Sequence, residues 1–507
     1  MASYILSIDQ GTSSTKTILF NEEGKAVARG HEPLKSYFYE GGLVEQEPEE
    51  IYTNVLASVV KCIDAFKANG GDLTDVKTCG ISNQRETFVV WDEDGKPLHN
   101  AIVWQCKRSV KICERLKSEG HEAVIKNKTG LIVDPYFSGT KLIWLYRNVD
   151  KVRKAIDEGK AYFGTIDTWL LYKLTNGKSY LTDYTNASRT LFFNLSGLHW
   201  DKELLSLFGL SKLNLPQAKP SSYLFGESNF NGLLNEPIDI TGMIGDSHAA
   251  AFGEGCFSPG TAKATIGTGS SILMNIGDEV KDSKNGMITT ICWSTEDRID
   301  YAFEGVIVSC GSTIEWLKNN VGIIADSRQT EAMARSVTDN NGVYLVPAFS
   351  GLGAPYWDMT RKGSITGLTF DCNKNHIVRA ALESIPYQIK DVIEAMEQDA
   401  EIELQELMVD GGITSNKFVL QFLSDLLQRE IINIGMPDVS ALGAAYMAGL
   451  KAGIFKDLNH LQLLNGDKTF IYPVENSANV KRWYAGWRSE IERNATPVKR
   501  QQAGNSL

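Results

Sequence analysis

The chain has 507 residues, which is too many for one hydrophobic core, so we expect two large domains with a cleft between them. Its 51 basic and 62 acidic residues give a net charge of −11 without any basic stripe or arm, which argues against a nucleic-acid partner. No apolar run reaches the roughly 18 residues that a membrane span needs, so we expect a cytoplasmic protein without a membrane span.

The first predicted strand covers residues 5–8, ends in Asp9 and turns at Gly11. A carboxylate at a strand end can hold Mg²⁺, and a glycine lets backbone N–H groups approach a phosphate without a Cβ in the way. The turn continues through the hydroxyl residues Thr12, Ser13 and Ser14. This pattern points to nucleotide chemistry, although a local Asp-x-Gly turn explains the same residues without any ligand.

Strand-like runs at residues 79–82, 88–91 and 101–104 come next, and a polar turn at 92–95 separates the last two. Strand-like runs continue to alternate with helical patterns along the rest of the chain. This alternation is typical of an α/β protein.

Two polar segments that follow predicted strands are candidates for substrate chemistry. Arg85 and Glu86 are neighbours, and a guanidinium that donates beside a carboxylate that accepts can bind vicinal hydroxyls. A surface ion pair is the alternative interpretation. Asp246 stands between an apolar stretch and the small-residue run 249–251, which makes it a candidate general base at a strand end. Its alternative role is that of a helix N-cap.

A second strand-and-glycine unit consists of a strand over 262–266 and a glycine-hydroxyl turn over 267–270. Like the first unit, it is a strand that leads into a turn of glycine and hydroxyl residues, but it lacks the carboxylate. We therefore predict a duplicated architecture with one phosphate turn in each half. The loop before this unit is the expected domain boundary. The resulting division is 1–253, 254–496 and a polar tail over 497–507.

The C-terminal part begins with a predicted amphipathic helix over 376–398, kinked at Pro386. A βαβα unit follows, with a strand at 407–410, a helix at 416–428, a strand at 431–434 and a helix at 440–450. Gly411 and Gly412 form a turn that leads to Asn416, where the free N–H groups of a helix start favour an anion or a nucleotide. The alternative is that Asn416 serves only to start the helix.

Taken together, these segments resemble the FGGY family of carbohydrate kinases. The matching segments span about residues 4–450 and are 7–12, 83–87, 101–105, 134–141, 166–170, 182–190, 351–358, 376–380 and 441–445. Residues 136–148 and 363–383 also fit the two signature patterns of that family. On these residues the chain is identified as a member of the family, most similar to those members that phosphorylate glycerol.

The resemblance implies an actin/hexokinase-like (ribonuclease H-like) fold, in which two domains close over ATP, Mg²⁺ and a small polyol. It implies a phosphotransferase with an alcohol group as acceptor, and glycerol, converted to sn-glycerol 3-phosphate, is the first expectation. Erythritol, threitol or a ketose is the alternative acceptor. An actin- or chaperone-like ATPase is the alternative outside the kinases. The family also suggests a homodimer or homotetramer.

The resemblance also assigns roles to individual residues. The polyol would be bound by Arg85, Glu86, Trp104, Tyr136 and Asp246. Asp246 would be the general base, and Asp9 would serve the metal. The nucleotide would be contacted by Thr12, Ser13, Ser14, Lys16, Thr268, Gly311, Gly412 and Asn416. Lys16 stands where the glycerol-phosphorylating members often have arginine, so the charge is kept and the bidentate fork is lost.

Three departures from the family pattern fall near the expected site. Ser247 and His248 replace a Gln-Gln pair, and Ser270 and Ser271 stand where an aromatic wall is expected. These changes leave more room and more hydroxyls, which suits a longer polyol such as a tetritol; drift around the pocket without a change of substrate is the alternative. Glu315 replaces a glutamine expected near the nucleotide base, so adenine contacts there are expected to differ.

Overall fold

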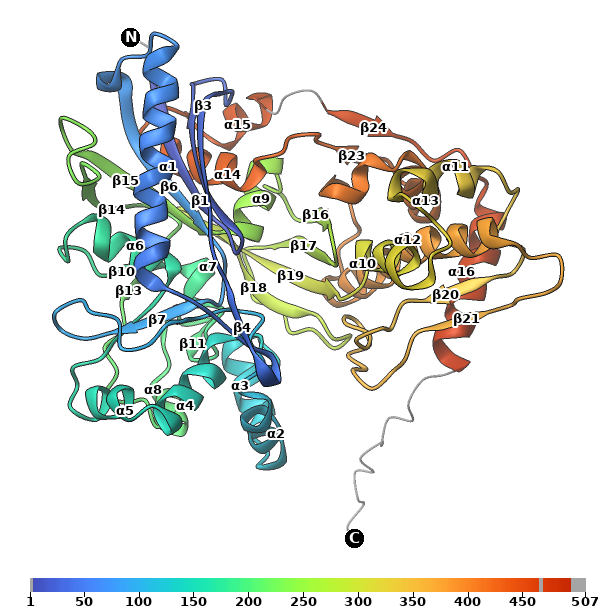
Figure 1. Cartoon of the computed structure of the whole chain (residues 1–507), viewed down its shortest axis with the longest axis horizontal. Helices are drawn as coiled ribbons and strands as arrows, with labels where there is room; N and C mark the ends of the chain where they lie inside the picture. Colours follow the sequence, from blue (N-terminus) through green and yellow to red (C-terminus); the bar gives the residue numbers. More distant parts are fainter. Residues whose placement is uncertain (1–2, 465–467, 494–507) are drawn as a thin grey trace.

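The computed structural model describes residues 3–464 and 468–493, and the predicted polar tail over 497–507 lies outside the described residues. Two mixed sheets with one topology form the framework of the molecule (Figure 1). The first sheet has an antiparallel run β3-β2-β1, after which β6 and β15 are parallel to β1. The second sheet has an antiparallel run β18-β19-β17-β16, after which β22 and β23 are parallel to β16. The predicted α/β class and duplicated architecture are therefore confirmed.

The first sheet has the order β14-β15-β6-β1-β2-β3. Its strands are β1 (Tyr4–Gln10), β2 (Ser14–Phe20), β3 (Ala26–Pro33), β6 (Val76–Asn83), β14 (Ser222–Ser228) and β15 (Ile238–Gly245). The second sheet has the order β18-β19-β17-β16-β22-β23-β24. Its strands are β16 (Thr261–Ile266), β17 (Ser270–Gly277), β18 (Ile288–Ser294), β19 (Ile299–Ile307), β22 (Glu406–Asp410), β23 (Ile431–Asn433) and β24 (Thr469–Ile471).

The predicted C-terminal elements are present with shifts of one or two residues at their ends. The βαβα unit consists of β22, α13 (Lys417–Leu427), β23 and α14 (Val439–Lys451). The predicted amphipathic helix is α12 (Lys374–Ala400), which contains Pro386. Apolar periodicity located these helices well because each buries one stripe against a sheet or a neighbouring helix.

A smaller sheet, β4-β5-β8-β7-β9, is attached to the first half of the chain. Its strands are β4 (Tyr37–Tyr39), β5 (Leu43–Gln46), β7 (Phe88–Trp91), β8 (Ala101–Ile102) and β9 (Tyr162–Thr165). The predicted strand over 101–104 ends at Ile102, two residues early. Trp104 leaves the ladder because its backbone N–H donates to the hydroxyl of Thr87, at 3.1 Å. Its ring is thereby freed to face the space between the two large sheets.

Helix α9 (Asp246–Glu254) lies between the two large sheets and contacts β15 and β6 of the first and β16 and β17 of the second (Figure 1). Helix α14 packs against α9 and against the first sheet, although it belongs to the C-terminal half of the chain. These helices approach closely because glycines face them. A Cβ added at Gly443 would lie 1.8 Å from the carbonyl oxygen of Ala249, and one at Gly80 would lie 2.2 Å from that of Ala444.

We therefore expect Gly443→Ala to lower the free energy of unfolding by about 1–3 kcal/mol, the usual effect of overpacking, because backbone atoms cannot move aside as a side chain can. Urea unfolding measures this change. Gly412→Ala is the matched control, since a Cβ there meets no atom within 4 Å, and its effect should stay within about 0.5 kcal/mol. Equal urea midpoints for Gly443→Ala and the wild type would contradict the close contact of α9 with α14.

Within residues 3–464 and 468–493, no helix has the length and apolar content required to cross a bilayer.

Candidate active site

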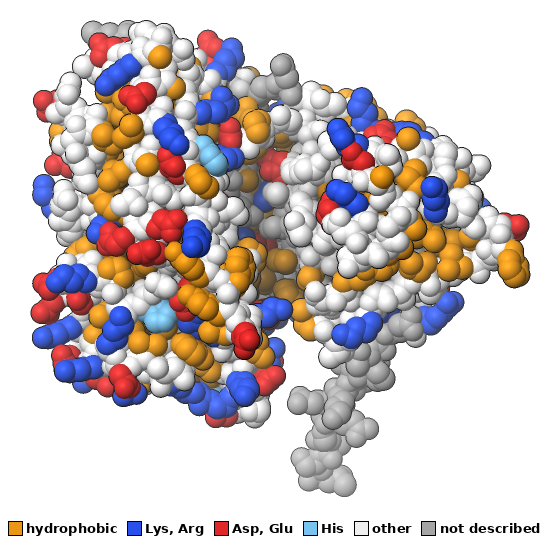
Figure 2. Space-filling view, viewed as in Figure 1, with side chains coloured by type: hydrophobic (Ala, Val, Ile, Leu, Met, Phe, Trp, Pro, Cys, Tyr) orange, Lys and Arg blue, Asp and Glu red, His pale blue; other side chains and the backbone are white. Residues whose placement is uncertain are grey.

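Three cavities join into one cleft between the two large sheets, and Figure 2 shows a deep groove between the two halves of the molecule. The first, second and third cavities have volumes of about 320, 460 and 590 Å³. Thr265, Asp410 and Ser440 line both the first and the second cavity. Gly267 lines the first and the third, and Gly412 the second and the third. A ligand with several parts can thus extend through all three.

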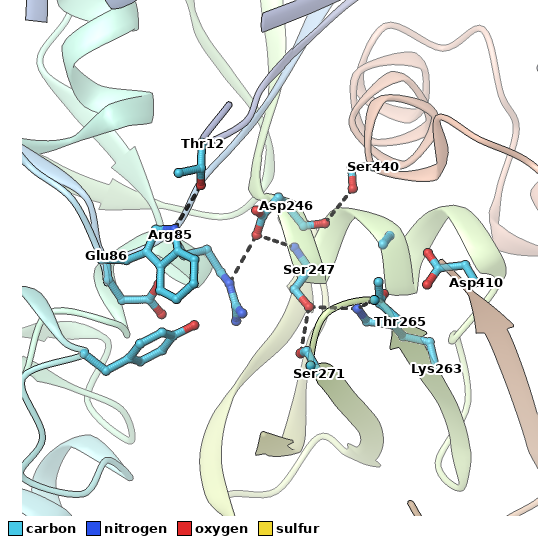
Figure 3. Close-up of a pocket in the computed structure, with 15 residues that line it drawn as sticks. Thr12, Arg85, Glu86, Asp246, Ser247, Lys263, Thr265, Ser271, Asp410 and Ser440 are labelled. Carbon is cyan, nitrogen blue, oxygen red and sulfur yellow. Dashed lines mark hydrogen bonds and ion pairs between the residues drawn. The ribbon is translucent and has the colours of Figure 1, made fainter. Parts of the chain in front are cut away.

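The first cavity brings together all five predicted polyol-binding residues and one of the predicted nucleotide contacts (Figure 3). They are Arg85, Glu86, Trp104, Tyr136, Asp246 and Thr12. Apart from Asp246, which opens α9, these residues lie in loops outside the strands and helices. Loops at strand ends on a rigid sheet are where binding residues are commonly held.

Two arrangements fix the aromatic wall of the first cavity. Trp104 donates from Nε1 to Oγ1 of Thr12 at 2.9 Å, and its ring meets that of Tyr136 edge-on with the centroids 5.6 Å apart. Lys141, in α4 (Ser138–Asn148), donates from Nζ to the backbone carbonyls of Tyr136 and Trp104 at 2.7 and 3.1 Å. The buried ammonium of Lys141 therefore fixes the backbone positions of the two aromatic residues relative to each other.

A buried ion-pair network that the sequence did not predict supports the charged wall of the cavity. Arg85 pairs through Nε with Oδ1 of Asp246 at 3.3 Å and through Nη2 with Oε1 of Glu304 at 2.8 Å. Arg189 pairs through Nε with Oε1 of Glu86 and through Nη1 with Oε2 of Glu304, both at 2.6 Å. Glu304 lies in β19 of the second sheet, so its two arginine partners reach it across the cleft.

The charges of this network are set by the balance of burial and pairing. Burial by itself raises the pKa of Glu304, but Arg189 and Arg85 outweigh it and hold that pKa well below its usual range, so this carboxylate stays ionised. Burial raises the pKa of Glu86 despite the nearby Arg189 and Arg85. One sequence signal could have found Glu304, because it is a lone glutamate inside an otherwise largely apolar strand.

The wall facing the second sheet carries a lysine and a set of hydroxyls (Figure 3). Lys263 of β16 is 1% exposed and donates from Nζ to Oγ of Ser247 and to Oγ1 of Thr265, both at 2.8 Å. Ser247 Oγ lies 3.1 Å from Ser271 Oγ. His248 lies outside the cavity lining and is fully buried, and burial holds its pKa well below the usual range, so it packs as a neutral imidazole.

The second cavity contains Asp9, the predicted metal ligand. The pKa of Asp9 is raised to about 6, mainly by burial and to a smaller extent by the negative charge of Asp246. Two carboxylates that face one cleft and repel each other suit a bound cation. The described residues include no group of three or more side chains that could hold a metal ion by themselves. Mg²⁺ commonly takes one or two carboxylates from a protein and completes its shell with water and phosphate.

Lys16 lies beside the second cavity without lining it. Its Nζ pairs with Oδ1 of Asp438 at 3.0 Å, and Arg29 pairs with the other carboxylate oxygen at 3.1 Å. Asp438 itself lines the cavity. Lys16 therefore acts on the cleft through Asp438 in this structure, and its contact with a nucleotide stays a prediction.

The third cavity holds three of the six remaining predicted nucleotide contacts. Thr268, Gly311 and Gly412 line it, together with Glu315. Ser13, Ser14 and Asn416 line none of the three cavities. The side-chain oxygen of Asn416 accepts from the N–H groups of Phe418 and Val419, which is the helix-start role given above as its alternative. The nucleotide roles of these three residues stay predictions.

Gly412 offers a direct test of the third cavity as a nucleotide site. A Cβ at this position meets no protein atom within 4 Å, so Gly412→Val should fold normally and place its side chain in the cavity. We expect the KM for ATP to rise by at least about tenfold, which corresponds to about 1.4 kcal/mol. Steady-state kinetics and calorimetric nucleotide binding measure the change, and an unaltered affinity for ATP and ADP would remove Gly412 from the site.

Two sheets of one topology, a glycine turn in each half and a carboxylate-lined cleft between them define a two-domain phosphotransferase of the actin/hexokinase-like class. The chain belongs to the FGGY family of carbohydrate kinases. The model of the N-terminal domain of that family matches residues 4–253, and the model of its C-terminal domain matches residues 262–452.

Curated relatives and solved structures resemble the chain over nearly its whole length. The glycerol kinase of Carboxydothermus hydrogenoformans is 44% identical over 491 residues, which cover 97% of this chain and 98% of the relative. That of Thermoanaerobacter pseudethanolicus is 45% identical over 495 residues, 97% of this chain and 99% of the relative. The crystal structure of Plasmodium falciparum glycerol kinase with ADP has a TM-score of 0.92 at 36% identity, covering 98% of this chain and 99% of that one. Gluconate kinase from Lactobacillus acidophilus shares the fold, with a TM-score of 0.89 at 21% identity, covering 98% of this chain and 99% of that one.

Proposed function

We propose that the protein transfers the γ-phosphoryl group of ATP to glycerol and releases sn-glycerol 3-phosphate and ADP. One observation carries the proposal: a cavity with hydroxyl-binding charges and an aromatic wall opens, through shared residues, onto a cavity lined by glycine turns. The relatives that are about 45% identical and are named glycerol kinase support glycerol as the acceptor.

On the acceptor side, each side chain has a chemical role that fits a polyol. Arg85 donates to hydroxyl oxygens, and its Nη1 has no hydrogen-bond partner among the described residues. Glu86 accepts from hydroxyls, and Tyr136 borders the same space. Trp104 covers the carbon chain with its ring.

On the nucleotide side, Thr12 and the turn at Gly267 and Thr268 would face the phosphates. Gly311 and Gly412 would border the rest of the nucleotide in the third cavity. Asp9 would hold Mg²⁺, with Asp246 directly after β15, which lies two strands from β1 in the same sheet. When bound with the phosphates, Mg²⁺ neutralises their charge and so favours attack by a neutral hydroxyl.

Asp246 accepts the proton of the attacking hydroxyl and keeps its oxygen in line with the transferred group. Arg85, 3.3 Å from the Asp246 carboxylate, fixes the orientation of that base. Because the transition state of phosphoryl transfer is loose, alignment contributes as much as basicity. Closing of the cleft excludes water, which would otherwise accept the phosphoryl group.

The proposal is tested by following ADP release with ATP and Mg²⁺, first without acceptor and then with glycerol. We expect glycerol to raise the rate by orders of magnitude and to yield one glycerol phosphate per ADP. An ATPase of the actin or chaperone type would release ADP at the same rate with and without any polyol, and that result would reject the kinase assignment.

We also propose the division into domains over 1–253 and 254–496, and assembly as a homodimer or homotetramer. The first is checked by limited proteolysis at the loop after α9, and the second by sedimentation of the full chain.

A further inference from the structure

We propose that Ser247 and Ser271 form an additional hydroxyl-binding subsite in the first cavity, and that the enzyme phosphorylates linear four-carbon polyols as well as glycerol. The inference rests on the proposed function, because it concerns the acceptor cavity of that kinase. It is carried by the direction of the hydrogen bonds that link Lys263, Ser247, Ser271 and Glu304. Figure 3 shows the first two of these bonds, from Lys263 to Ser247 and from Ser247 to Ser271.

The direction of each bond follows from the chemistry of the two ends. Lys263 can only donate, so Ser247 Oγ accepts from it at 2.8 Å. Glu304 is ionised and can only accept, so Ser271 Oγ donates to it at 3.3 Å. The hydrogen of Ser271 is then used, and at the 3.1 Å contact between the two hydroxyls Ser247 is the donor. The chain runs one way, from the ammonium to the carboxylate.

With the hydrogen bonds in this direction, each of the two serines can accept one further hydrogen bond. Each hydroxyl oxygen has two lone pairs and accepts one hydrogen bond within the chain, so each keeps one lone pair. Both serines line the cavity. A ligand must therefore bring a donor to this wall. Phosphate oxygens of ATP are acceptors and cannot fill the subsite without reversing the chain, whereas a polyol hydroxyl can.

Apart from Lys263 and Asp410, three charged residues line the first cavity, and these three already account for the hydroxyls of glycerol. Arg85, Glu86 and Asp246 give one donor group and two acceptor groups, which is enough for three hydroxyls. The cavity volume of about 320 Å³ is roughly ten times the ~30 Å³ that one water occupies in the liquid. Glycerol has six non-hydrogen atoms and leaves part of that space open. A fourth carbon with its hydroxyl would reach Ser247 and Ser271, which together form the serine wall of the cavity.

The test compares erythritol and the two threitols with butane-1,2,3-triol, which has the same carbon chain without the fourth hydroxyl. For the wild type we expect kcat/KM for the best tetritol to exceed that for butane-1,2,3-triol by at least tenfold. Glycerol is measured in parallel as the reference for the proposed function.

Two variants assign the difference to the serine wall. Ser271→Ala removes the accepting oxygen, and the tetritol-to-triol ratio of kcat/KM should fall by about tenfold, the effect of one neutral hydrogen bond. Ser270→Ala is the matched control, because Ser270 is the preceding residue of β17 and points to the opposite face of the sheet, outside the cavity. It should leave the ratio unchanged. Ser247→Ala should act as Ser271→Ala does.

The outcomes separate the two claims. Rapid phosphorylation of glycerol with no detectable transfer to any tetritol would overturn the subsite and leave the proposed function standing. Transfer to tetritols with a ratio that Ser271→Ala and Ser247→Ala do not change would also overturn it. Failure of every polyol, glycerol included, would overturn the proposed function and this inference with it.

Discussion

Asp246→Asn is expected to lower kcat for phosphoryl transfer to glycerol by about 10²–10⁴-fold, the range that a positioned general base contributes. The amide keeps the size of the side chain but cannot take the proton of the attacking hydroxyl. It also removes a negative charge that acts on Asp9, which weakens the site for Mg²⁺. Initial rates at saturating ATP and glycerol measure the loss.

The control for Asp246→Asn is an equally conservative change at another helix start. Asp201 caps α8 (Lys202–Phe208) and pairs with Lys128, and it lines none of the three cavities. Asparagine caps helices about as well as aspartate, so Asp201→Asn should keep kcat within about twofold. Nucleotide affinity of Asp246→Asn, measured by calorimetry with ADP alone, should stay close to that of the wild type. Near-normal transfer by Asp246→Asn would remove this residue from the mechanism.

Glu304→Gln is expected to lower the free energy of unfolding by about 3–5 kcal/mol, because it leaves buried arginine charge without its partner. Arg85 and Arg189 both pair with Glu304, and each also pairs with a carboxylate that lines the first cavity, where the acceptor would bind. We therefore expect a functional effect confined to the acceptor. The KM for glycerol should rise at least tenfold, while the KM for ATP changes less than threefold.

Glu383→Gln provides the matched control for Glu304→Gln. Glu383 lies in α12 and pairs with Arg379 at 2.7 Å in a similarly buried ion pair that faces none of the three cavities. It should lower stability without changing the ratio of the two KM values. Guanidinium unfolding and steady-state kinetics on both variants separate the effects. A parallel rise of both KM values in Glu304→Gln would mean that the network only stabilises the fold.

The sequence determined those parts of the protein that depend on neighbours along the chain. Strand-glycine-hydroxyl turns are local, so the amino-acid sequence alone locates Asp9 and the turns at Thr12 and Gly267. Arg85 and Glu86 were found for the same reason, because they are adjacent and follow a strand. The α/β class followed from the spacing of apolar residues, which reflects burial on one side of each element.

Only the tertiary structure decided which distant residues meet. Glu304 pairs with Arg85 and Arg189 across a separation of more than a hundred residues, and Lys263 reaches Ser247 from a different element, strand β16. Such partners depend on strand register and on how α9 is held between two sheets. A local sequence pattern predicts neither of these. Asn416 shows the opposite case, because its side-chain oxygen accepts from the nearby N–H groups of Phe418 and Val419, a local role that the sequence itself offered. Turns and pairs of neighbours are local properties, whereas the wall that shapes an acceptor cavity is assembled from both halves of the chain.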